Sequence, residues 1–117
     1  MTTKRLVITA GEPAGIGPDL TLALSQESWP HQLVVCADKT LLAERAQMLG
    51  IEVELLDYDS TALKQPQRSG TLVVKHVPLA EVAVAGQLNE ANGHYVLNTL
   101  ETAAIGCMND EFDAIVT

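Results

Sequence analysis

The sequence predicts an α/β protein with a mostly parallel sheet and flanking helices. Short apolar runs rich in valine, leucine and isoleucine alternate with segments that have helical spacing and helix-capping residues. Of the 117 residues, 47% are hydrophobic but only 3% are aromatic, a composition typical of strands buried on both faces. A glycine-rich turn also joins the first strand to the first helix, as in many α/β proteins.

The first half of the chain gives two strand–helix pairs. We expect strands at Arg5 to Thr9 and Gln32 to Cys36, because both runs are short and apolar. A helix is expected from Pro18 to about Gln26. A second helix should run to about Leu49, with Asp38 as its N-cap and Gly50 at its C-terminal end. The predicted buried stripe of this second helix consists of Leu41, Leu42, Arg45, Met48 and Leu49.

The middle of the chain predicts an edge strand and a polar loop. Ile51 to Leu56 alternates apolar and acidic residues, which indicates a half-exposed strand near a sheet edge. Residues 57–70 are rich in Asp, Ser, Thr, Gln and Pro and predict a surface loop. A further strand is expected at Thr71 to Val74, followed by an irregular connector over residues 78–86.

The last segment predicts a long helix and a final strand. The helix runs from about Leu88 to Cys107, or begins only after Asn92-Gly93, since glycine costs a helix interior about 1 kcal/mol relative to alanine. Residues 114–117 form an apolar strand. Ligands of open parallel sheets gather beyond the carboxyl ends of the strands.

The turn Gly11-Glu12-Pro13-Ala14-Gly15-Ile16-Gly17-Pro18-Asp19 is the most informative motif. Its glycines allow close approach of a ligand, and Pro18 suits the first turn of a helix. Neither standard phosphate motif is present, because Gly17 is not followed by Lys-Ser/Thr and Leu20 replaces the third glycine of a dinucleotide fingerprint. A loop that only turns a strand into a helix explains the same residues.

Two acidic residues belong to this turn. Glu12 either binds a ligand hydroxyl or accepts hydrogen bonds from backbone amides of the loop. Asp19 lies in the expected first helical turn, where a carboxylate interacts favourably with the helix dipole.

The complete string resembles the N-terminal signature of the 4-hydroxythreonine-4-phosphate dehydrogenases, a family with the isocitrate and isopropylmalate dehydrogenase fold. The resemblance continues in Leu33-Val34-Val35-Cys36-Ala37-Asp38, in Ala85-Gly86-Gln87-Leu88 with Asn92-Gly93-His94-Tyr95-Val96, and in Asp113-Ala114-Ile115-Val116-Thr117. It therefore spans nearly the whole chain. Family members are about twice the size of an ordinary ~150-residue domain, so residues 1–117 resemble the N-terminal α/β segment of a larger two-lobed enzyme whose C-terminal lobe lies outside this chain.

The resemblance implies an NAD- or NADP-dependent oxidative decarboxylation of 4-phosphohydroxy-L-threonine in pyridoxal phosphate biosynthesis. A divalent metal (Zn, Mg or Co) would polarise the forming ketone. Its ligands, and the residues that hold the substrate, are expected outside this chain, so no catalytic or metal-binding residue is assigned here. Gly11, Glu12, Gly15 and Gly17 are the candidate cofactor-binding residues, as the lining of a cleft. The resemblance also implies a cytoplasmic homodimer, with this segment inactive by itself.

Composition excludes several other classes. The formal net charge is −8, which argues against nucleic acid or an anionic membrane as partner. No apolar run approaches the ~20 residues of a membrane span. Cys36 and Cys107 have no metal or redox spacing and indicate reduced, buried thiols. The three histidines match no zinc pattern.

Two alternatives stay open. A paralogous dehydrogenase of a phosphorylated threonate or erythronate would share this segment, because its substrate-specific residues also lie elsewhere. The second alternative is a non-enzymatic α/β binding module, for example a receiver-like domain. A receiver needs acidic residues after its first strand, where this chain has Thr9-Ala10-Gly11, and a lysine after its fifth.

Overall fold

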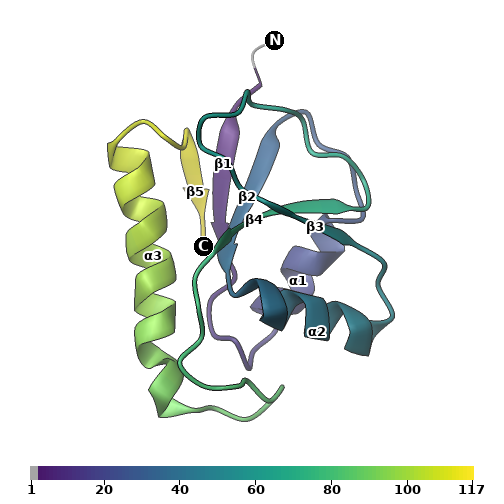
Figure 1. Cartoon of the computed structure of the whole chain (residues 1–117), viewed down its shortest axis with the longest axis vertical. Coiled ribbons are helices and arrows are strands. Elements are labelled where there is room, and N and C mark those ends of the chain that lie inside the picture. The colour runs from purple at the N-terminus through teal and green to yellow at the C-terminus, as the bar shows by residue number, and fades with distance from the viewer. Residues whose placement is uncertain (1–2) are drawn as a thin grey trace.

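Five parallel strands form one sheet in the order β3-β4-β2-β1-β5 (Figure 1). The computed structural model describes residues 3–117. The strands are β1 (Arg5–Thr9), β2 (Gln32–Ala37), β3 (Glu54–Asp57), β4 (Thr71–His76) and β5 (Ala114–Val116). The predicted α/β class with a mostly parallel sheet is confirmed.

Helices cover both faces of the sheet, which gives three layers. On one face lie α1 (Gly17–Leu24) and α2 (Lys39–Leu49), where Leu22 and Leu42 pack into a core with Val35. On the other face lies α3 (Gly93–Met108), where Tyr95 and Ala103 join a second core with Val34. A short 3-10 helix, η1 (Glu90–Asn92), precedes α3. Figure 1 shows α3 on the side of the molecule opposite to α1 and α2.

The centre of the sheet is the most deeply buried part of the molecule. Every residue of β2 is buried, and Val34 to Ala37 are completely inaccessible to solvent. This burial on two faces explains why β2 lacks an apolar–polar alternation. The edge strand β3 is partly exposed, which confirms its expected position at a sheet edge.

Both predicted ends of α2 are confirmed. The carboxylate of Asp38 accepts a hydrogen bond from the Leu41 amide at 3.0 Å, as an N-cap should. Gly50 closes the helix in the left-handed conformation with φ of 68°. The connector over residues 78–86 is irregular, and α3 begins at Gly93, which confirms the later of the two predicted starts.

Three predicted details are wrong. The strand predicted from Ile51 begins at Glu54, because the Ile51 amide bonds the Ala46 carbonyl at 2.9 Å and so belongs to the end of α2. Helix α1 ends at Leu24, two residues before Gln26. Met48 and Leu49, expected in the buried stripe of α2, are 68% and 46% exposed.

Candidate functional site

The candidate site is the carboxyl edge of the sheet, where parallel α/β proteins bind their ligands. Residues 10–16, here called the glycine loop, leave β1 at this edge and enter α1. Asp38 follows β2 at the same edge, and residues 77–86 follow β4. These segments lie at the lower end of the sheet in Figure 1.

The glycine loop has a fixed shape maintained by its own hydrogen bonds. Gly11 adopts a φ of 75°, which reverses the chain as it leaves β1. The Gly15 amide donates to the Glu12 carbonyl at 3.0 Å, and the Ala14 amide donates to Glu12 Oε1 at 3.2 Å. Of the two roles considered for Glu12, the structure thus confirms the bond to a loop amide.

Gly17 is required by packing against β1. A Cβ at Gly17 would lie 1.7 Å from the Ala10 carbonyl oxygen, so no side chain fits without displacing backbone. The start of α1 can approach the end of β1 only because this position is glycine. The requirement is internal to the protein and needs no ligand to explain it.

A buried arginine on α2 holds the glycine loop through hydrogen bonds to its backbone carbonyls. The Arg45 side chain is 4% exposed, and its Nη1 donates to the Gly15 carbonyl at 3.0 Å and to Asp19 Oδ1 at 2.7 Å. Its Nη2 donates to the Pro13 carbonyl at 2.8 Å. A guanidinium can be buried when it has an anionic partner and fixed acceptors, as here.

Arg45 adds contacts to two sequence-based expectations that the structure confirms. Its place in the α2 stripe is buried as predicted, but the stripe there is polar and binds loop carbonyls. Asp19 lies in the first turn of α1 as predicted, and it also forms the ion pair with Arg45. The contacts of Arg45 with the glycine loop were not predicted, and an arginine inside an apolar helical stripe was the signal that could have revealed them.

The connector after β4 is tied to the glycine loop and to Asp38. The Gly86 amide donates to the Ala14 carbonyl at 2.8 Å. Asp38 Oδ2 accepts from the Leu79 amide at 2.8 Å, so one carboxylate caps α2 and holds the connector. Although it has no regular secondary structure, the connector is thus bonded to both neighbouring parts of the carboxyl edge.

Helix α3 and the short helix η1 before it each contribute one buried polar side chain to this edge, Tyr95 and Asn92. Tyr95 Oη accepts a hydrogen bond from the Asp38 amide at 3.0 Å, and burial raises the pKa of Tyr95 to about 12. Asn92 bonds both the amide and the carbonyl of Glu81, at 3.0 and 3.2 Å. At neutral pH the Tyr95 hydroxyl stays protonated, so these contacts hold backbone in place and do not supply acid–base groups.

A shallow cleft of about 290 Å³ opens beside these groups. Asp38 and Glu44 line it together with Thr40, Leu41 and residues 79–83. Its ionisable lining residues, which include Glu81, are all acidic. A phosphorylated ligand at this edge would therefore depend on backbone amides or on cations from elsewhere.

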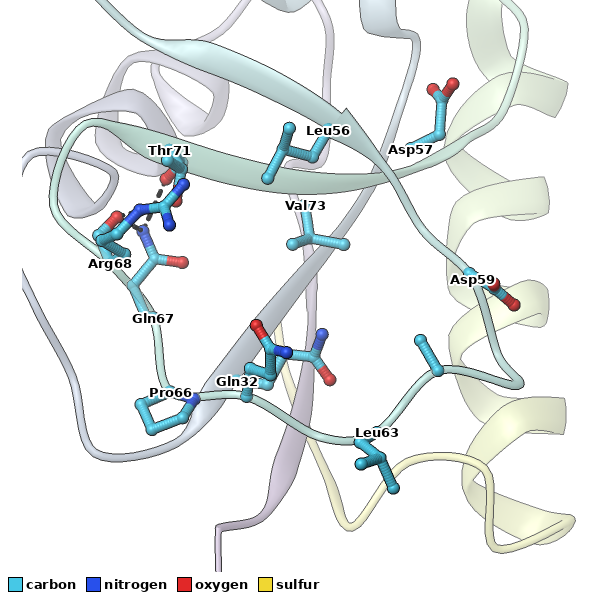
Figure 2. Close-up of a pocket in the computed structure, with 12 residues that line it drawn as sticks. Gln32, Leu56, Asp57, Asp59, Leu63, Pro66, Gln67, Arg68, Thr71 and Val73 are labelled. Atoms are coloured by element: carbon cyan, nitrogen blue, oxygen red, sulfur yellow. Dashed lines mark hydrogen bonds between the residues drawn. The ribbon is translucent and has the colours of Figure 1, made fainter.

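A larger groove of about 400 Å³ lies away from this edge (Figure 2). Gln32 and Thr71, at the amino-terminal ends of β2 and β4, line it with Leu56 and Val73, and the loop after β3 closes it. Helix α3 packs on β1, β2 and β5. The groove lies on the part of the same sheet face that is formed by β3 and β4. Because ligands of parallel sheets bind at the carboxyl edge, we do not assign this groove to the active site.

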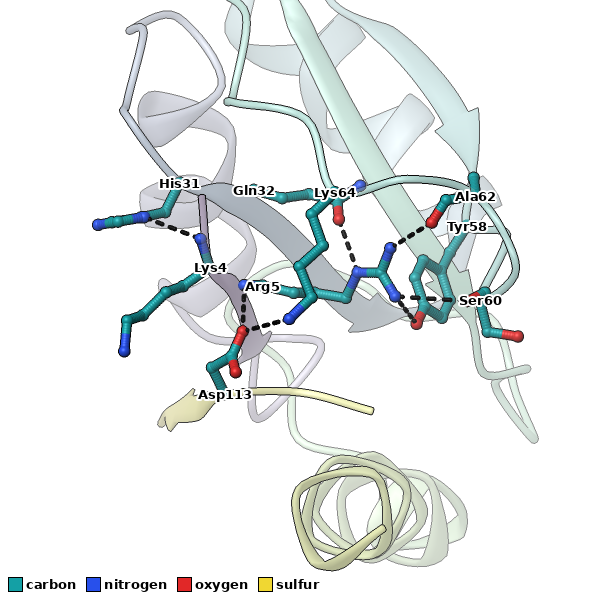
Figure 3. A network of polar contacts seen from close by, with 9 residues as sticks. All are labelled: Lys4, Arg5, His31, Gln32, Tyr58, Ser60, Ala62, Lys64 and Asp113. Atoms are coloured by element: carbon teal, nitrogen blue, oxygen red, sulfur yellow. Dashed lines mark hydrogen bonds and ion pairs between the residues drawn. The ribbon is translucent and has the colours of Figure 1, made fainter. Parts of the chain in front are cut away.

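A second buried arginine organises the loop beside that groove (Figure 3). Arg5 is 4% exposed, and its guanidinium donates to Gln32 Oε1 at 2.7 Å, to Tyr58 Oη at 3.1 Å and to the Ala62 carbonyl at 2.9 Å. It also lies 5.2 Å from the centroid of the Tyr58 ring. Asp113 Oδ2 completes the network by accepting from the Arg5 amide and from Lys64 Nζ, each at 2.8 Å.

The other histidines, cysteines and acidic residues are dispersed over the part of the chain that the structure describes. Within residues 3–117, no group of three or more His, Cys, Asp or Glu side chains is placed to hold a metal ion. His31 Nδ1 and His76 Nδ1 each accept a backbone amide hydrogen at 3.0 Å. Cys36 and Cys107 are free thiols, the former buried as predicted and the latter partly buried, and burial raises the pKa of Cys36 to about 11. None of the helices described is long and apolar enough to cross a membrane.

Comparison with known proteins gives one consistent result. The family model for "Pyridoxal phosphate biosynthetic protein PdxA" matches residues 28–117. The 4-hydroxythreonine-4-phosphate dehydrogenases of Vibrio cholerae and Vibrio vulnificus are both 71% identical to the chain, over 117 and 114 residues. The matches cover 100% and 97% of this chain but 36% and 35% of the relatives. The chain thus spans about a third of the length of these curated relatives.

Solved structures agree on the fold. A putative 4-hydroxythreonine-4-phosphate dehydrogenase from Salmonella typhimurium superimposes with a TM-score of 0.80 at 30% identity, over 97% of this chain and 36% of that one. A 4-hydroxythreonine-4-phosphate dehydrogenase from Klebsiella pneumoniae gives a TM-score of 0.78 at 23% identity, over 97% and 36% of the two chains. At that identity the second match supports the fold alone.

Proposed function

This chain belongs to the PdxA family of pyridoxal phosphate biosynthetic proteins, and we propose that it forms the N-terminal part of a dehydrogenase acting on 4-phosphohydroxy-L-threonine. The observation that carries the proposal is the 71% identity over all 117 residues to a curated dehydrogenase of that substrate's name. In the proposed reaction a hydride passes from the hydroxyl-bearing carbon to NAD or NADP, and the resulting β-keto acid loses carbon dioxide. The complete protein would be a cytoplasmic homodimer.

The proposed role of this segment is to shape one wall of the cleft. Gly11, Glu12, Gly15 and Gly17 remain the predicted cofactor-side residues. The first three belong to the glycine loop and Gly17 begins α1, at the edge where such ligands bind. Its only ionisable side chain before Asp19 is Glu12, which already accepts the Ala14 amide. The contribution of the loop is therefore position and backbone, not proton transfer.

The metal-dependent part of the reaction has no counterpart among the described residues. A bound divalent ion would stabilise negative charge on the substrate oxygen, but residues 3–117 hold no cluster of three candidate ligands. We therefore propose that the residues that bind the metal lie outside residues 1–117.

A chimeric enzyme tests the proposal. This chain replaces the matched 36% of the Vibrio cholerae dehydrogenase, and NAD(P)H formation is measured with 4-phosphohydroxy-L-threonine and a divalent metal. We expect turnover close to that of the Vibrio enzyme, and none from the 117-residue chain alone. Glu12→Gln keeps an acceptor for the Ala14 amide, so activity should stay within a few fold.

Two results would contradict this account. A folded chimera without turnover would refute the assignment of substrate and reaction. A fall in kcat of more than about 100-fold in the Glu12→Gln chimera, with KM unchanged, would give Glu12 a chemical role and refute the purely structural one.

A further inference from the structure

Helix α3 has two apolar faces, and only one of them is covered. Tyr95, Thr99, Ala103 and Gly106 face the sheet and are buried. On the opposite side, three and four residues apart, the helix exposes Leu97, Leu100, Ala104, Ile105 and Met108. Leu97 is 60% exposed and Met108 is 82% exposed, and the single charged residue of the helix is Glu101. His94, Asn98 and Glu101 are exposed polar residues of the same helix. The outer face of a solvated helix is normally polar or charged, so this mixed face favours burial against another element.

The neighbouring strand β5 has the same property. Its three residues Ala114, Ile115 and Val116 are all exposed, and it pairs only with β1. Ile115 and Val116 are 40% and 48% exposed although they point to opposite faces of the sheet. Edge strands of soluble proteins usually carry charges or bulges that prevent further pairing, and β5 has neither. Helix α3 packs on β5 (Figure 1), so the two form one continuous surface.

We propose that the outer face of α3 together with β5, here called the α3–β5 surface, is the docking surface for the remaining part of a PdxA-family polypeptide. The curated relatives are nearly three times as long as the segment they share with this chain, since that segment is 36% of the Vibrio cholerae protein. Among Asp, Glu, Lys and Arg, only Glu101 belongs to the α3–β5 surface, and this scarcity of charge matches a permanent intramolecular contact. The inference rests on family membership, not on the proposed substrate.

The unpaired edge of β5 and the outer face of α3 each require a different covering element. A strand alongside β5 would satisfy the unpaired edge, and an apolar helix or sheet face would cover Leu97, Ile105 and Met108. Both elements belong to the expected continuation of a parallel α/β sheet. A second copy of the chain is the competing occupant, and its presence would show as a change in oligomeric state.

Paired charge substitutions test the surface in two contexts. Leu97→Glu with Met108→Glu alters the α3–β5 surface. The matched control is Leu63→Glu with Met48→Glu, which replaces residues of similar exposure, 85% and 68%, elsewhere on the molecule. Each pair is introduced into the 117-residue chain and into the chimera with the Vibrio cholerae protein, and the thermal midpoint and oligomeric state are measured.

We expect neither pair to shift the midpoint of the 117-residue chain by more than a degree or two, because all four side chains point to solvent. In the chimera, the Leu97/Met108 pair should lower the midpoint by several degrees, while the Leu63/Met48 pair leaves it unchanged. Equal midpoints for both pairs in the chimera would overturn the proposal. So would a Leu97/Met108 pair that only converts a dimer into an equally stable monomer, because that result assigns the surface to a second copy. These readouts do not depend on substrate, so they are separate from the test of activity.

Discussion

An irregular loop lies near each end of strand β1, and a buried arginine holds each loop. The glycine loop follows β1 itself, whereas the loop near its amino end follows β3. At the carboxyl end Arg45 bonds two carbonyls of the glycine loop and forms an ion pair with Asp19. At the amino end the Arg5 side chain donates to acceptors that are uncharged, among them Tyr58 Oη and the Ala62 carbonyl. The two side chains are equally buried, with equal residue exposures of 4%.

The difference lies in what each arginine holds. Pro13 and Ala14 of the glycine loop are buried, whereas residues 59–66 are exposed and can exchange lost bonds for water. The glycine loop is also bonded to the connector through Gly86. The glycine loop therefore has more buried hydrogen bonds to hold its shape than the exposed loop of residues 59–66.

The largest effect should come from Arg45→Met, which keeps the aliphatic stem and removes the guanidinium. Two loop carbonyls and the Asp19 carboxylate lose their donor, and breaking a buried pair in this way costs 3–5 kcal/mol. Because the Asp19 side chain is 37% exposed and regains water, we expect about 3 kcal/mol. Urea unfolding of the chain measures it. A loss below about 1 kcal/mol, the level of an ordinary surface contact, would remove the distinction between the two arginines.

Arg5→Met should have a smaller effect of about 1–2 kcal/mol, the range for losing hydrogen bonds whose partners can be rehydrated. The Asp113 carboxylate keeps its bond to the backbone amide of residue 5 and its ion pair with Lys64. The same urea experiment gives the value. A cost above that of Arg45→Met would reverse the proposed ranking of the two loops.

The smallest expected effect is on the stability of the protein at low pH. The Arg5 amide, followed by Lys64, lowers the pKa of Asp113 below its usual value. A carboxyl group with a lower pKa in the folded state stabilises the protein above its unfolded pKa, about 3.9. That contribution is lost as the pH falls through the folded pKa. Asp113→Asn should therefore flatten the stability profile below about pH 4 and leave the slope near pH 7 unchanged. An identical acid profile in the variant and the parent chain would contradict this assignment.

The features that were predicted correctly depend on residues close together in the sequence. Asp38 and Gly50 act through local backbone rules, so both ends of α2 were placed correctly. The start of β3 was misplaced because Ile51 completes a hydrogen bond of the helix end, which an alternating pattern does not show. Met48 and Leu49 have the right spacing for burial, but no element lies where they could pack.

The place of the glycine loop in the sheet was predicted, but the contacts that hold it were not. The glycine loop lies at the carboxyl edge as expected, since strand–turn–helix order determines this placement. The contact of Arg45 with Gly15 joins residues 30 positions apart, and the Gly17 requirement depends on the Ala10 carbonyl. Both are tertiary contacts, and one sequence read alone gives no measure of them.

Amide hydrogen exchange tests the central claim that Arg45 fixes the shape of the glycine loop. The informative probes are the amides of Gly15 and Gly86, which are bonded within the carboxyl-edge network, and the amides of residues 59–64. Under native conditions, Arg45→Met should lose protection at Gly15 and Gly86, whereas Arg5→Met should change exchange only near residues 59–64. If Gly15 and Gly86 keep their protection in folded Arg45→Met protein, the loop holds its shape without the arginine and the claim is wrong.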